Sequence, residues 1–408
     1  MVLYELYKGK DYKIVPTLDR IQKAVNYVGL KNLCYTPILV GGTNGKGSTC
    51  AFSESILRHH GYKTGWFVSP HLFDERERWR INGQKISEER LEYYVSSLKK
   101  LFEKFELTYF EACTLIALIF FQDEKVEFGV FEVGMGGRWD ATKVCNPSAC
   151  AITNVQRDHT RWLGKTPEER AREKLGIYIS GKPLVLGSPR YPLYPLALEL
   201  CRKEDLLVAG MDFFAEGKVE GMQTWFDQFS SEFFQIGKVK LGLWGKWQID
   251  NASIAIALTA QVIKLKEDAV RLALESTRWE GRMEIIKKNP LLVLDGAHNT
   301  DGVKFVINQL KASGIKLVPV FTGLKEKEWR DSMKILRTFS DKIYLLELSH
   351  HRGESLSELV KEAEKLRFQE IITLNSPAEV LNLEEDALVV GSLYLVGEVK
   401  GCIETSKK

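Results

Sequence analysis

Glycines, one lysine and, after it, two hydroxyl side chains cluster in Gly41–Thr49, which reads Gly-Gly-Thr-Asn-Gly-Lys-Gly-Ser-Thr. The segment follows an apolar run and precedes a helical pattern, which is the context in which a glycine-rich loop cradles phosphate. Glycines let main-chain N–H groups turn toward an anion, and the helix N-terminus adds a partial positive charge. Lys46 adds a full charge for the terminal phosphates, and Ser48 or Thr49 adds a hydroxyl. The segment therefore predicts a nucleotide-binding loop.

This loop differs from the standard Walker pattern at two positions. Val40 stands where that pattern has its first glycine, and Gly47 stands where Ser or Thr follows the lysine. The plain alternative is a glycine-rich turn between a strand and a helix with an incidental lysine. The coincidence of a lysine, two hydroxyls and four glycines in this context favours the nucleotide site.

Polar residues also follow several predicted strands at the point where each strand ends. They are Ser69, Glu132, the run Arg157-Asp158-His159, and the run Asp295-Gly-Ala-His298-Asn299. In an open parallel sheet, ligands bind outside the carboxyl ends of the strands. Oxygen ligands suit Mg²⁺, which is held by few protein groups and by substrate phosphates. Taken singly, Glu132 could be a satisfied structural carboxylate and Asp158 a helix cap, but several strands delivering polar groups to one edge favour a site.

Short apolar strands alternate with helical stretches over most of the chain, which predicts an α/β protein with a mostly parallel sheet. The strands expected first are 37–40, 63–68, 126–131, 150–155 and 183–187. A glycine-punctuated, aromatic stretch over 213–246 predicts hairpins on an edge of the first domain. A second series follows Gly281, with strands expected at 291–294, 316–321, 342–346, 370–373 and 387–390 and helices at 302–313, 326–338, 357–366 and 393–402. We place the domain boundary near Glu280-Gly281.

The composition excludes several classes of protein. The 408 residues carry a net charge of +3, with 44% hydrophobic and 27% charged residues, which is typical of a globular chain. The alternation of Glu75 and Glu77 with Arg76, Arg78 and Arg80 predicts a mixed-charge loop, so we expect no nucleic-acid partner. No apolar run reaches the roughly 20 residues of a membrane span, so we expect no membrane partner. Seven cysteines without CxxC spacing predict reduced thiols, and we expect a cytoplasmic monomer.

The chain resembles a known family, the bacterial folylpolyglutamate synthases/dihydrofolate synthases of the Mur ligase superfamily. The resemblance follows the family's order over nearly the whole chain. It is carried by the segments 42–48, 69–72 (Ser-Pro-His-Leu), 108–111 (Thr-Tyr-Phe-Glu), 132–142, 153–159, 173–177, 247–252, 281–284, 295–299 (Asp-Gly-Ala-His-Asn) and 391–397. The phosphate loop alone would indicate a Mur-like ligase, and the Ser-Pro-His-Leu, Tyr-Phe-Glu and Asp-Gly-Ala-His-Asn segments narrow it to the folate branch.

The resemblance implies an ATP-dependent ligase that adds L-glutamate to dihydropteroate or to the γ-carboxylate of a folate through an acyl phosphate. It implies an N-terminal Mur-type P-loop ATPase domain with a folate or pteroate pocket over 1–280. Residues 281–408 should form a Rossmann-like domain that contributes to nucleotide and glutamate binding. The expected cofactors are ATP and Mg²⁺ at one or two sites.

The resemblance also assigns roles residue by residue. The residues expected to bind ATP are Asn44, Gly45, Lys46, Gly47, Ser48, Thr49, Asn251, Arg282 and Asp295. The residues expected to hold magnesium are Ser69, Glu132 and His159. The residues expected to border the pterin pocket are Tyr109, Phe110, Glu111, Trp139, Asp140 and Ala141, with Trp139 in place of a common aliphatic residue. His298 should lie near the nucleotide or glutamate, and Lys46, His159, His298 and Lys174 are the catalytic candidates.

Lys174 matches the lysine that the family carries as a carbamate. A neutral amine is a poor magnesium ligand, whereas a carbamate offers two anionic oxygens. The alternative is a lysine that makes an ordinary salt bridge.

Two other functions are compatible with parts of the pattern. A different Mur-like ligase, acting for example on a peptidoglycan precursor, would have the same loop, but a UDP-sugar substrate would normally require a further N-terminal domain. A nucleotide-binding switch without ligase chemistry would need the loop alone. The polar strand ends and the second α/β domain argue against the switch.

The phosphate loop gives a first prediction. Lys46→Ala should abolish turnover and leave the fold intact, because a phosphate-loop lysine stabilises charge and packs little. Turnover would be measured by ADP release and folding by circular dichroism. A normal kcat in a folded Lys46→Ala protein would contradict the assignment of the loop.

Overall fold

The computed structural model describes residues 2–7, 16–325, 328–349 and 352–405. The chain divides into two compact units. The first comprises Met1–Gly217, Phe226–Gly242 and Gln248–Thr277, and the second comprises Lys218–Trp225, Leu243–Trp247 and Arg278–Lys408.

An eight-stranded sheet forms the centre of the first unit, in the order β4-β3-β2-β5-β1-β6-β7-β8. Its strands are β1 (Thr36–Gly41), β2 (Thr64–Phe67), β3 (Trp79–Ile81), β4 (Gln84–Lys85), β5 (Phe128–Glu132), β6 (Ala149–Ile152), β7 (Leu184–Leu186) and β8 (Leu206–Val208). All neighbours are parallel except β3 and β4 at one edge, which confirms the predicted mostly parallel sheet. Val40 pairs with both Glu132 and Ala151, so the carboxyl ends of β1, β5 and β6 meet at one edge.

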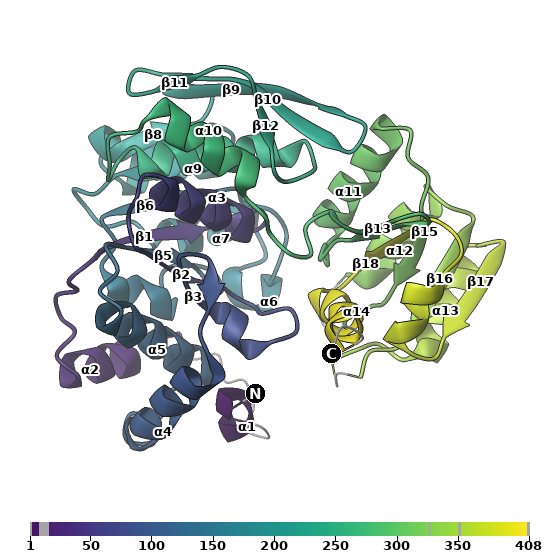
Figure 1. Ribbon diagram of the computed structural model, residues 1–408, viewed down its shortest axis with the longest axis horizontal. Coiled ribbons are helices and arrows are strands. Elements are labelled where there is room, and N and C mark those ends of the chain that lie inside the picture. Colours follow the sequence, from purple (N-terminus) through teal and green to yellow (C-terminus); the bar gives the residue numbers. More distant parts are fainter. Residues whose placement is uncertain (1, 8–15, 326–327, 350–351, 406–408) are drawn as a thin grey trace. The chain divides into compact units, whose positions relative to one another are not determined.

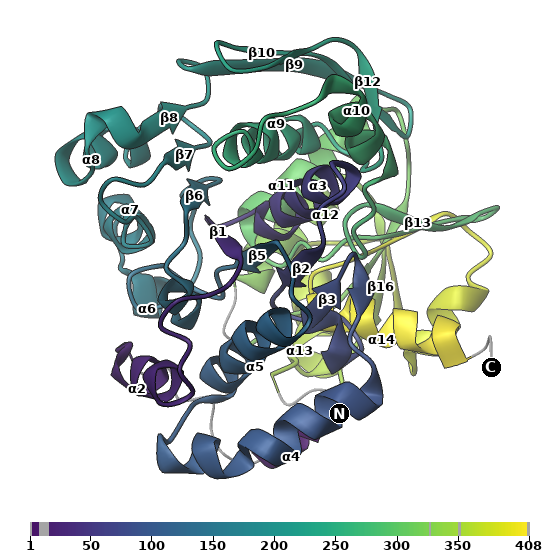
Figure 2. The same ribbon diagram turned by 60° about the vertical axis from the view of Figure 1, so that its left-hand side comes forward.

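Helices cover both faces of this sheet, as its apolar strands require. Figures 1 and 2 show α3, α9 and α10 on one face and α4 and α5 on the other. The helices are α1 (Val2–Tyr7), α2 (Asp19–Tyr27), α3 (Lys46–His59), α4 (Glu88–Lys104), α5 (Tyr109–Asp123), α6 (Thr160–Leu163), α7 (Pro167–Leu175), α8 (Leu193–Leu200), α9 (Trp247–Thr259) and α10 (Glu267–Ser276). Short 3₁₀ turns add η1 (Glu75–Arg78), η2 (Ala141–Cys145) and η3 (Lys203–Asp205).

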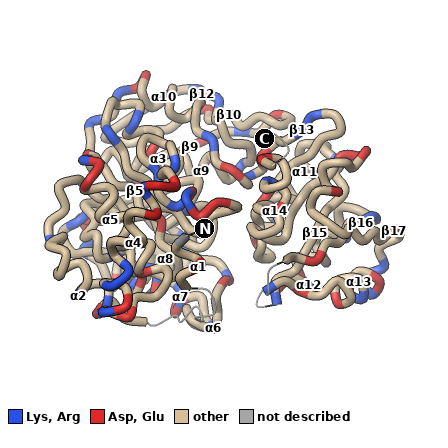
Figure 3. The backbone as a smooth tube through the Cα atoms, turned by 60° about the horizontal axis from the view of Figure 1, so that its bottom comes forward, with Lys and Arg blue, Asp and Glu red and all other residues tan. Residues whose placement is uncertain are grey.

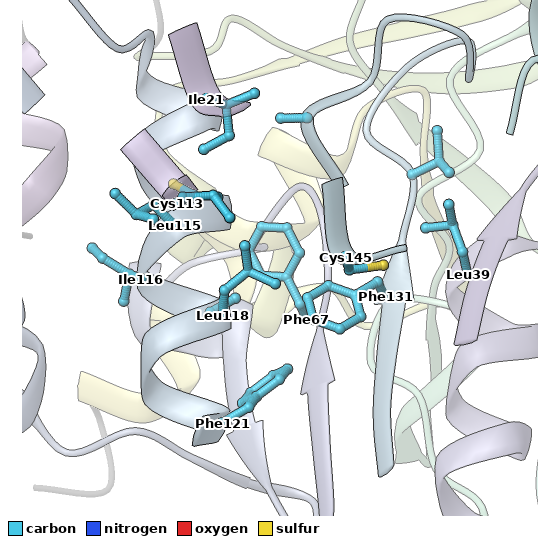
Figure 4. Close-up of a cluster of buried hydrophobic side chains, with 14 of the residues drawn as sticks. Ile21, Leu39, Phe67, Cys113, Leu115, Ile116, Leu118, Phe121, Phe131 and Cys145 are labelled. Atoms are coloured by element: carbon cyan, nitrogen blue, oxygen red, sulfur yellow. The ribbon is translucent and has the colours of Figure 1, made fainter. Parts of the chain in front are cut away.

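Aromatic side chains fill the core between the sheet and α5. Phe67 from β2, Phe131 from β5 and Phe121 from α5 are fully buried and lie against one another (Figure 4). The ring centroid of Phe131 is 5.5 Å from that of Phe121 and 6.2 Å from that of Phe67. Such buried rings supply much of the apolar area that stabilises a domain. The core thereby fixes the strands whose ends carry the candidate site.

A second, smaller sheet contains β9 (Phe213–Glu220), β10 (Gln223–Ser231), β11 (Gln235–Ile236) and β12 (Val239–Leu241). The structure confirms strands in this stretch, and they form a sheet of their own. Along β9, Phe214, Glu216 and Lys218 are exposed, whereas the central strands β2, β5 and β6 of the large sheet are buried on both faces.

The second unit has a six-stranded sheet in the order β13-β14-β18-β15-β16-β17. Its strands are β13 (Glu284–Lys288), β14 (Leu291–Leu294), β15 (Val318–Phe321), β16 (Lys342–Leu346), β17 (Glu370–Leu374) and β18 (Ala387–Val390). Its helices are α11 (Thr300–Ala312), α12 (Trp329–Arg337), α13 (Leu356–Lys365), η4 (Pro377–Asn382) and α14 (Leu393–Thr405). The predicted alternation is confirmed, and β13 is an antiparallel edge strand that the pattern did not predict. Residues 326–327 of the predicted 326–338 helix lie outside the described residues.

Figure 3 shows basic and acidic residues interspersed along the backbone of both units, in agreement with the small net charge of +3. Of the helices in the described part of the chain, none has the length and apolar character needed to cross a bilayer.

Candidate active site around the phosphate loop

The phosphate loop joins β1 to α3 with two glycines in the left-handed region of backbone space. Gly42 has φ of +136° and Gly45, directly before the first residue of α3, has φ of +88°. A Cβ on Gly42 would lie 1.9 Å from Oγ1 of Thr153, and one on Gly45 would lie 2.3 Å from Oδ1 of Asn251. Neither position has room for a side chain, so the glycines permit both the turn and the close approach of neighbouring groups.

The segment that follows β6 holds the loop from one side. Oγ1 of Thr153 and Nδ2 of Asn154 donate to the carbonyl of Asn44, at 2.7 and 2.9 Å. In return, the main-chain N–H of Asn44 donates to Oδ1 of Asn154 at 3.0 Å. The N–H of Gln156 donates to Oγ1 of Thr43 at 3.0 Å, and Nδ2 of Asn44 donates to Oε1 of Gln156. The side chain of Asn44, predicted to bind nucleotide, thus helps to shape the loop.

This bracing arrangement was not predicted. The sequence pattern extended the strand to Val155, but β6 ends at Ile152. Thr153 and Asn154 leave the strand because their side chains bond the loop. The signal that could have found them is the placement of two hydrogen-bonding side chains directly after a buried apolar strand.

Two ammonium groups converge on one carbonyl of the loop. Nζ of Lys46 donates to the carbonyls of Gly42 and Thr43 at 3.2 and 3.1 Å. Nζ of Lys174, from α7, donates to the same Gly42 carbonyl at 3.0 Å. Burial, and after it the neighbouring charge of Lys46, lowers the pKa of Lys174 to about 7. Lys46 and the partly protonated Lys174 make the loop electropositive, as a site for phosphate requires.

Two of the predicted magnesium ligands lie together at the end of β2 and β5. The main-chain N–H of Ser69 donates to Oε2 of Glu132 at 3.2 Å, and Glu132 is buried. The Ser69 hydroxyl and that of Thr49 are both buried and form no hydrogen bond within the described chain. A buried hydroxyl without a partner, beside a carboxylate, is the oxygen-rich donor set that Mg²⁺ prefers, so these residues fit such an ion.

The third predicted ligand, His159, is paired with Asp158. Nε2 of His159 lies 3.6 Å from Oδ2 of Asp158, and the main-chain N–H of His159 donates to Oδ1 of Asp158 at 2.9 Å. His159 adopts a left-handed conformation, with φ of +49°, immediately before α6. Within the described ranges, no group of three His, Cys, Asp or Glu side chains forms a ready-made metal cage.

Asn251 reaches the phosphate loop from α9. It is buried, and its Nδ2 donates to Oε1 of Gln248 at 2.9 Å. This bond leaves Oδ1 of Asn251 directed at Gly45. The predicted nucleotide-binding residue is therefore in van der Waals contact with the loop, and Gln248 fixes its orientation.

Tyr109, at the start of α5, contacts a buried polar cluster that the segment after β2 contributes. Its hydroxyl donates to Oε1 of Glu75 at 2.8 Å, and the guanidinium of Arg78 lies 5.3 Å from its ring centroid. Nε of Arg78 donates to Nδ1 of His71 at 2.9 Å. Burial, followed by the charge of Arg78, lowers the pKa of His71 to about 3, so this imidazole is neutral. The segment is the predicted mixed-charge one, and three of its charged side chains, Glu75, Glu77 and Arg78, are buried.

The next two residues of α5 have neighbours of their own. The Phe110 ring lies against Gly134, where a Cβ would be 2.6 Å from it. Glu111 accepts from the main-chain N–H of Thr108 at 2.7 Å and forms an ion pair with Arg20 at 3.0 Å. Glu111 thus caps its own helix and ties it to α2.

The remaining predicted pterin contacts differ in exposure. Asp140 is buried and accepts from the main-chain N–H groups of Met135 and Thr142, at 2.9 and 3.0 Å. Burial raises the pKa of its carboxyl group. It caps η2 (Ala141–Cys145), whose first residue is buried. Trp139, by contrast, is 48% exposed, so its indole is available to a ligand.

In the second unit, Asp295 organises the loop that follows β14. Its carboxylate accepts from the N–H groups of Met283 and Ala297, at 2.9 and 2.8 Å. Burial raises the pKa of Asp295, and the nearby Arg282 opposes that rise. Asp295 is therefore a loop-shaping residue within its own unit.

Arg282 and His298 flank this carboxylate. Nη1 of Arg282 donates to the carbonyl of Gly281 at 3.1 Å, and a Cβ on Gly296 would lie 2.4 Å from that nitrogen. Nδ1 of His298 lies 2.9 Å from the carbonyl of Gly296. The structure thus gathers Arg282, Asp295 and His298 in one loop cluster.

Two family models match this chain. Residues 40–259 match the Mur ligase middle domain, and residues 281–393 match the Mur ligase glutamate ligase domain. The first match spans the phosphate loop and the second spans the Asp295 cluster.

Individual relatives point to one branch of these ligases. The dihydrofolate synthase/folylpolyglutamate synthase of Bacillus subtilis (strain 168) is 30% identical over 419 residues, covering 95% of each chain. A structure described as E. coli FolC in complex with DHPP and ADP has a TM-score of 0.89 and 28% identity, covering 100% of this chain and 97% of that one. A bifunctional folylpolyglutamate synthase/dihydrofolate synthase with Mn, AMPPNP and L-glutamate bound has a TM-score of 0.86 and 27% identity, covering 98% of each chain.

A pair of glycine variants tests the contact between Asn251 and the loop. Gly45 and Gly61 have nearly the same backbone, with φ of +88° and +91°, but a Cβ on Gly61 would meet nothing within 4 Å. Both Gly→Ala variants should lose about 1 kcal/mol of stability from left-handed strain. Gly45→Ala should in addition weaken ATP binding about tenfold or more, because the loop or Asn251 must move. Calorimetric titration with ATP measures this, and equal affinities in the two variants would contradict it.

Proposed function

We propose the function on one premise: the chain belongs to the Mur ligase superfamily, in its dihydrofolate synthase/folylpolyglutamate synthase family. It is an ATP-dependent ligase that joins L-glutamate to the carboxylate of dihydropteroate or of a folate. The single observation that carries this proposal is the convergence of Lys46 and Lys174 on the Gly42 carbonyl, in a loop that opens α3. These two lysines and the N-terminus of α3 complement the negative charge of a triphosphate.

The reaction proceeds through an acyl phosphate in this proposal. The substrate carboxylate attacks the γ-phosphorus of ATP, a new O–P bond forms, and ADP leaves. The amino group of L-glutamate then attacks the carbonyl carbon, loses a proton, and displaces inorganic phosphate to leave an amide. Positioning and charge stabilisation account for most of such catalysis. The N–H groups of Gly45–Ser48 and the ammonium of Lys46 would supply the charge stabilisation.

Divalent metal would be held by Ser69, Glu132 and His159. The support is the buried, partnerless Ser69 hydroxyl beside the Glu132 carboxylate. Thr49, whose hydroxyl is also buried without a partner in the described chain, is a further candidate for this end of the loop. When bound, Mg²⁺ would neutralise charge on the transferring phosphoryl group.

The remaining roles follow the family. We propose residues 1–280 as the nucleotide and pterin domain and residues 281–408 as a domain that contributes Arg282 and Asp295 to nucleotide and His298 to nucleotide or glutamate. In the first unit, Asn251 contacts nucleotide. The pterin would be bordered by the segments 109–111 and 139–141, with Trp139 as the exposed side chain. The seven free cysteines support a reducing compartment, and we propose a cytoplasmic monomer.

The decisive test of this function is a product analysis. The protein is incubated with ATP, Mg²⁺ and L-glutamate, with dihydropteroate and tetrahydrofolate offered in parallel. We expect ADP release that depends on glutamate, and a mass increase in the acceptor equal to one or more glutamyl residues. The two acceptors distinguish a bifunctional enzyme from a monofunctional one. No glutamate-dependent ADP release with any pteroate or folate contradicts the proposal.

We propose in addition that Lys174 is carbamylated. The amine nitrogen attacks the carbon of CO₂, an N–C bond forms, and the nitrogen releases a proton. A pKa of about 7 leaves a large share of the amine neutral at neutral pH, which this attack requires. The ammonium of Lys46, which shares the Gly42 carbonyl with Lys174, would then face an anion in place of a second cation.

Labelled bicarbonate measures this modification. With ¹³C-bicarbonate, the wild-type protein should show a carbamate carbon resonance that Lys174→Met lacks. The resonance should grow as the pH rises through about 7, because a lowered pKa means that the amine is protonated below that value and neutral above it. An active wild-type enzyme with the same carbon spectrum as Lys174→Met at every pH would rule the carbamate out.

A further inference from the structure

Arg170 occupies an unusual place on α7. It is 5% exposed, and its guanidinium donates only to main-chain carbonyls among the contacts of the described residues. Nε donates to Gln156 at 3.1 Å, and Nη1 donates to Gly164 at 3.3 Å and to Lys165 at 3.0 Å. Within the described chain, no carboxylate forms an ion pair with Arg170.

These three carbonyls lie at the two ends of one segment. Gln156 precedes residues 157–163, and Gly164 and Lys165 follow them. One planar guanidinium therefore holds both ends of the segment together, which a single-point ammonium could not do. The segment carries His159 and α6, and α6 and α7 are neighbours in Figure 2.

The near end of the segment is also tied to the phosphate loop. Gln156 donates its N–H to Oγ1 of Thr43 and accepts from the Asn44 side chain, while its carbonyl accepts from Arg170. Lys174 lies four residues after Arg170 on the same buried face of α7 and reaches the carbonyl of Gly42. The buried face of α7 thus contacts the loop directly through Lys174. It also contacts the loop indirectly, because Arg170 bonds Gln156, which in turn bonds Thr43 and Asn44.

The backbone of His159 shows why such bracing is needed. Its φ of +49° is a left-handed conformation that disfavours residues with a Cβ. A conformation of this kind persists only where the surrounding structure over-determines it. Arg170 supplies that constraint by closing the ends of the segment on either side of His159.

We propose that Arg170 is a positioning residue, which closes the 157–163 segment and thereby holds His159 in place for the divalent metal. The metal role of His159 rests on the proposed function, whereas the closure of the segment by Arg170 stands on the geometry alone. In this proposal Arg170 acts through the main chain, by way of its three carbonyl contacts.

The same helix offers a matched control. Arg172 lies two residues from Arg170 but is solvent-accessible, and its side chain forms an ion pair with Glu199 at 3.0 Å. Arg172→Met removes the same chemical group from the exposed face of α7. Arg170→Met removes the three carbonyl contacts, and Arg170→Lys keeps the charge but cannot span both ends of the segment.

The first readout is hydrogen exchange without nucleotide or metal. Peptides that cover 157–163 should exchange faster in Arg170→Met than in the wild type, and at the wild-type rate in Arg172→Met. This measurement tests whether Arg170 closes the 157–163 segment, and it does so whether or not the protein is a ligase. Unchanged exchange over 157–163 in Arg170→Met overturns the proposal.

The second readout is the Mg²⁺ concentration that gives half-maximal glutamate-dependent ADP release at saturating ATP. It should rise about tenfold or more in Arg170→Met, rise less in Arg170→Lys and stay unchanged in Arg172→Met. An active Arg170→Met enzyme with the wild-type magnesium requirement overturns the link to His159. If Arg170→Met does not fold, both readouts are taken on Arg170→Lys, where wild-type values in either overturn the proposal. A wild-type protein that ligates no glutamate would refute the proposed function and leave the exchange result standing.

Discussion

The carbonyl of Gly42 accepts hydrogen bonds from the Nζ atoms of two lysines, and much of the first unit is arranged around that point. Bringing two like charges together in a buried loop is unfavourable unless an anion joins them. Burial lowers the pKa of Lys174, and the charge of Lys46 lowers it further. A bound nucleoside triphosphate would relieve this repulsion, and so would a carbamate on Lys174. The loop is therefore most favourable electrostatically when an anion is bound.

Such a loop needs a rigid frame, because an electropositive main chain without its anion would otherwise relax. The frame comes from three directions in the first unit. Thr153 and Asn154, which follow β6, donate hydrogen bonds to the carbonyl of Asn44, and Asn251 of α9 packs against Gly45. The buried face of α7 completes it with two basic side chains that donate to main-chain carbonyls. Preorganisation of this kind lets the charges act on the phosphoryl group without first rearranging.

The sequence predicted those features that are local in the chain. The phosphate loop was found because its glycines, lysine and hydroxyls are adjacent, and the parallel sheets were found because buried strands are apolar throughout. The bracing residues were missed because their roles depend on which strand ends are neighbours in space. Thr153 was placed inside a strand, and nothing in the spacing of Arg170 among the charged residues of α7 separates it from solvated Arg172. The burial of Arg78 could not be predicted for the same reason, since its partner Tyr109 is distant in sequence.

The central claim is that the cations of the phosphate loop serve transfer of a phosphoryl group from ATP to a substrate carboxylate. Oxygen tracing tests this most directly. Dihydropteroate or tetrahydrofolate carrying ¹⁸O in the reacting carboxylate is ligated to glutamate, and the released inorganic phosphate is analysed by mass spectrometry. Passage through an acyl phosphate predicts that each phosphate formed carries one oxygen from the labelled carboxylate. Ligated product accompanied by unlabelled phosphate would contradict the claim.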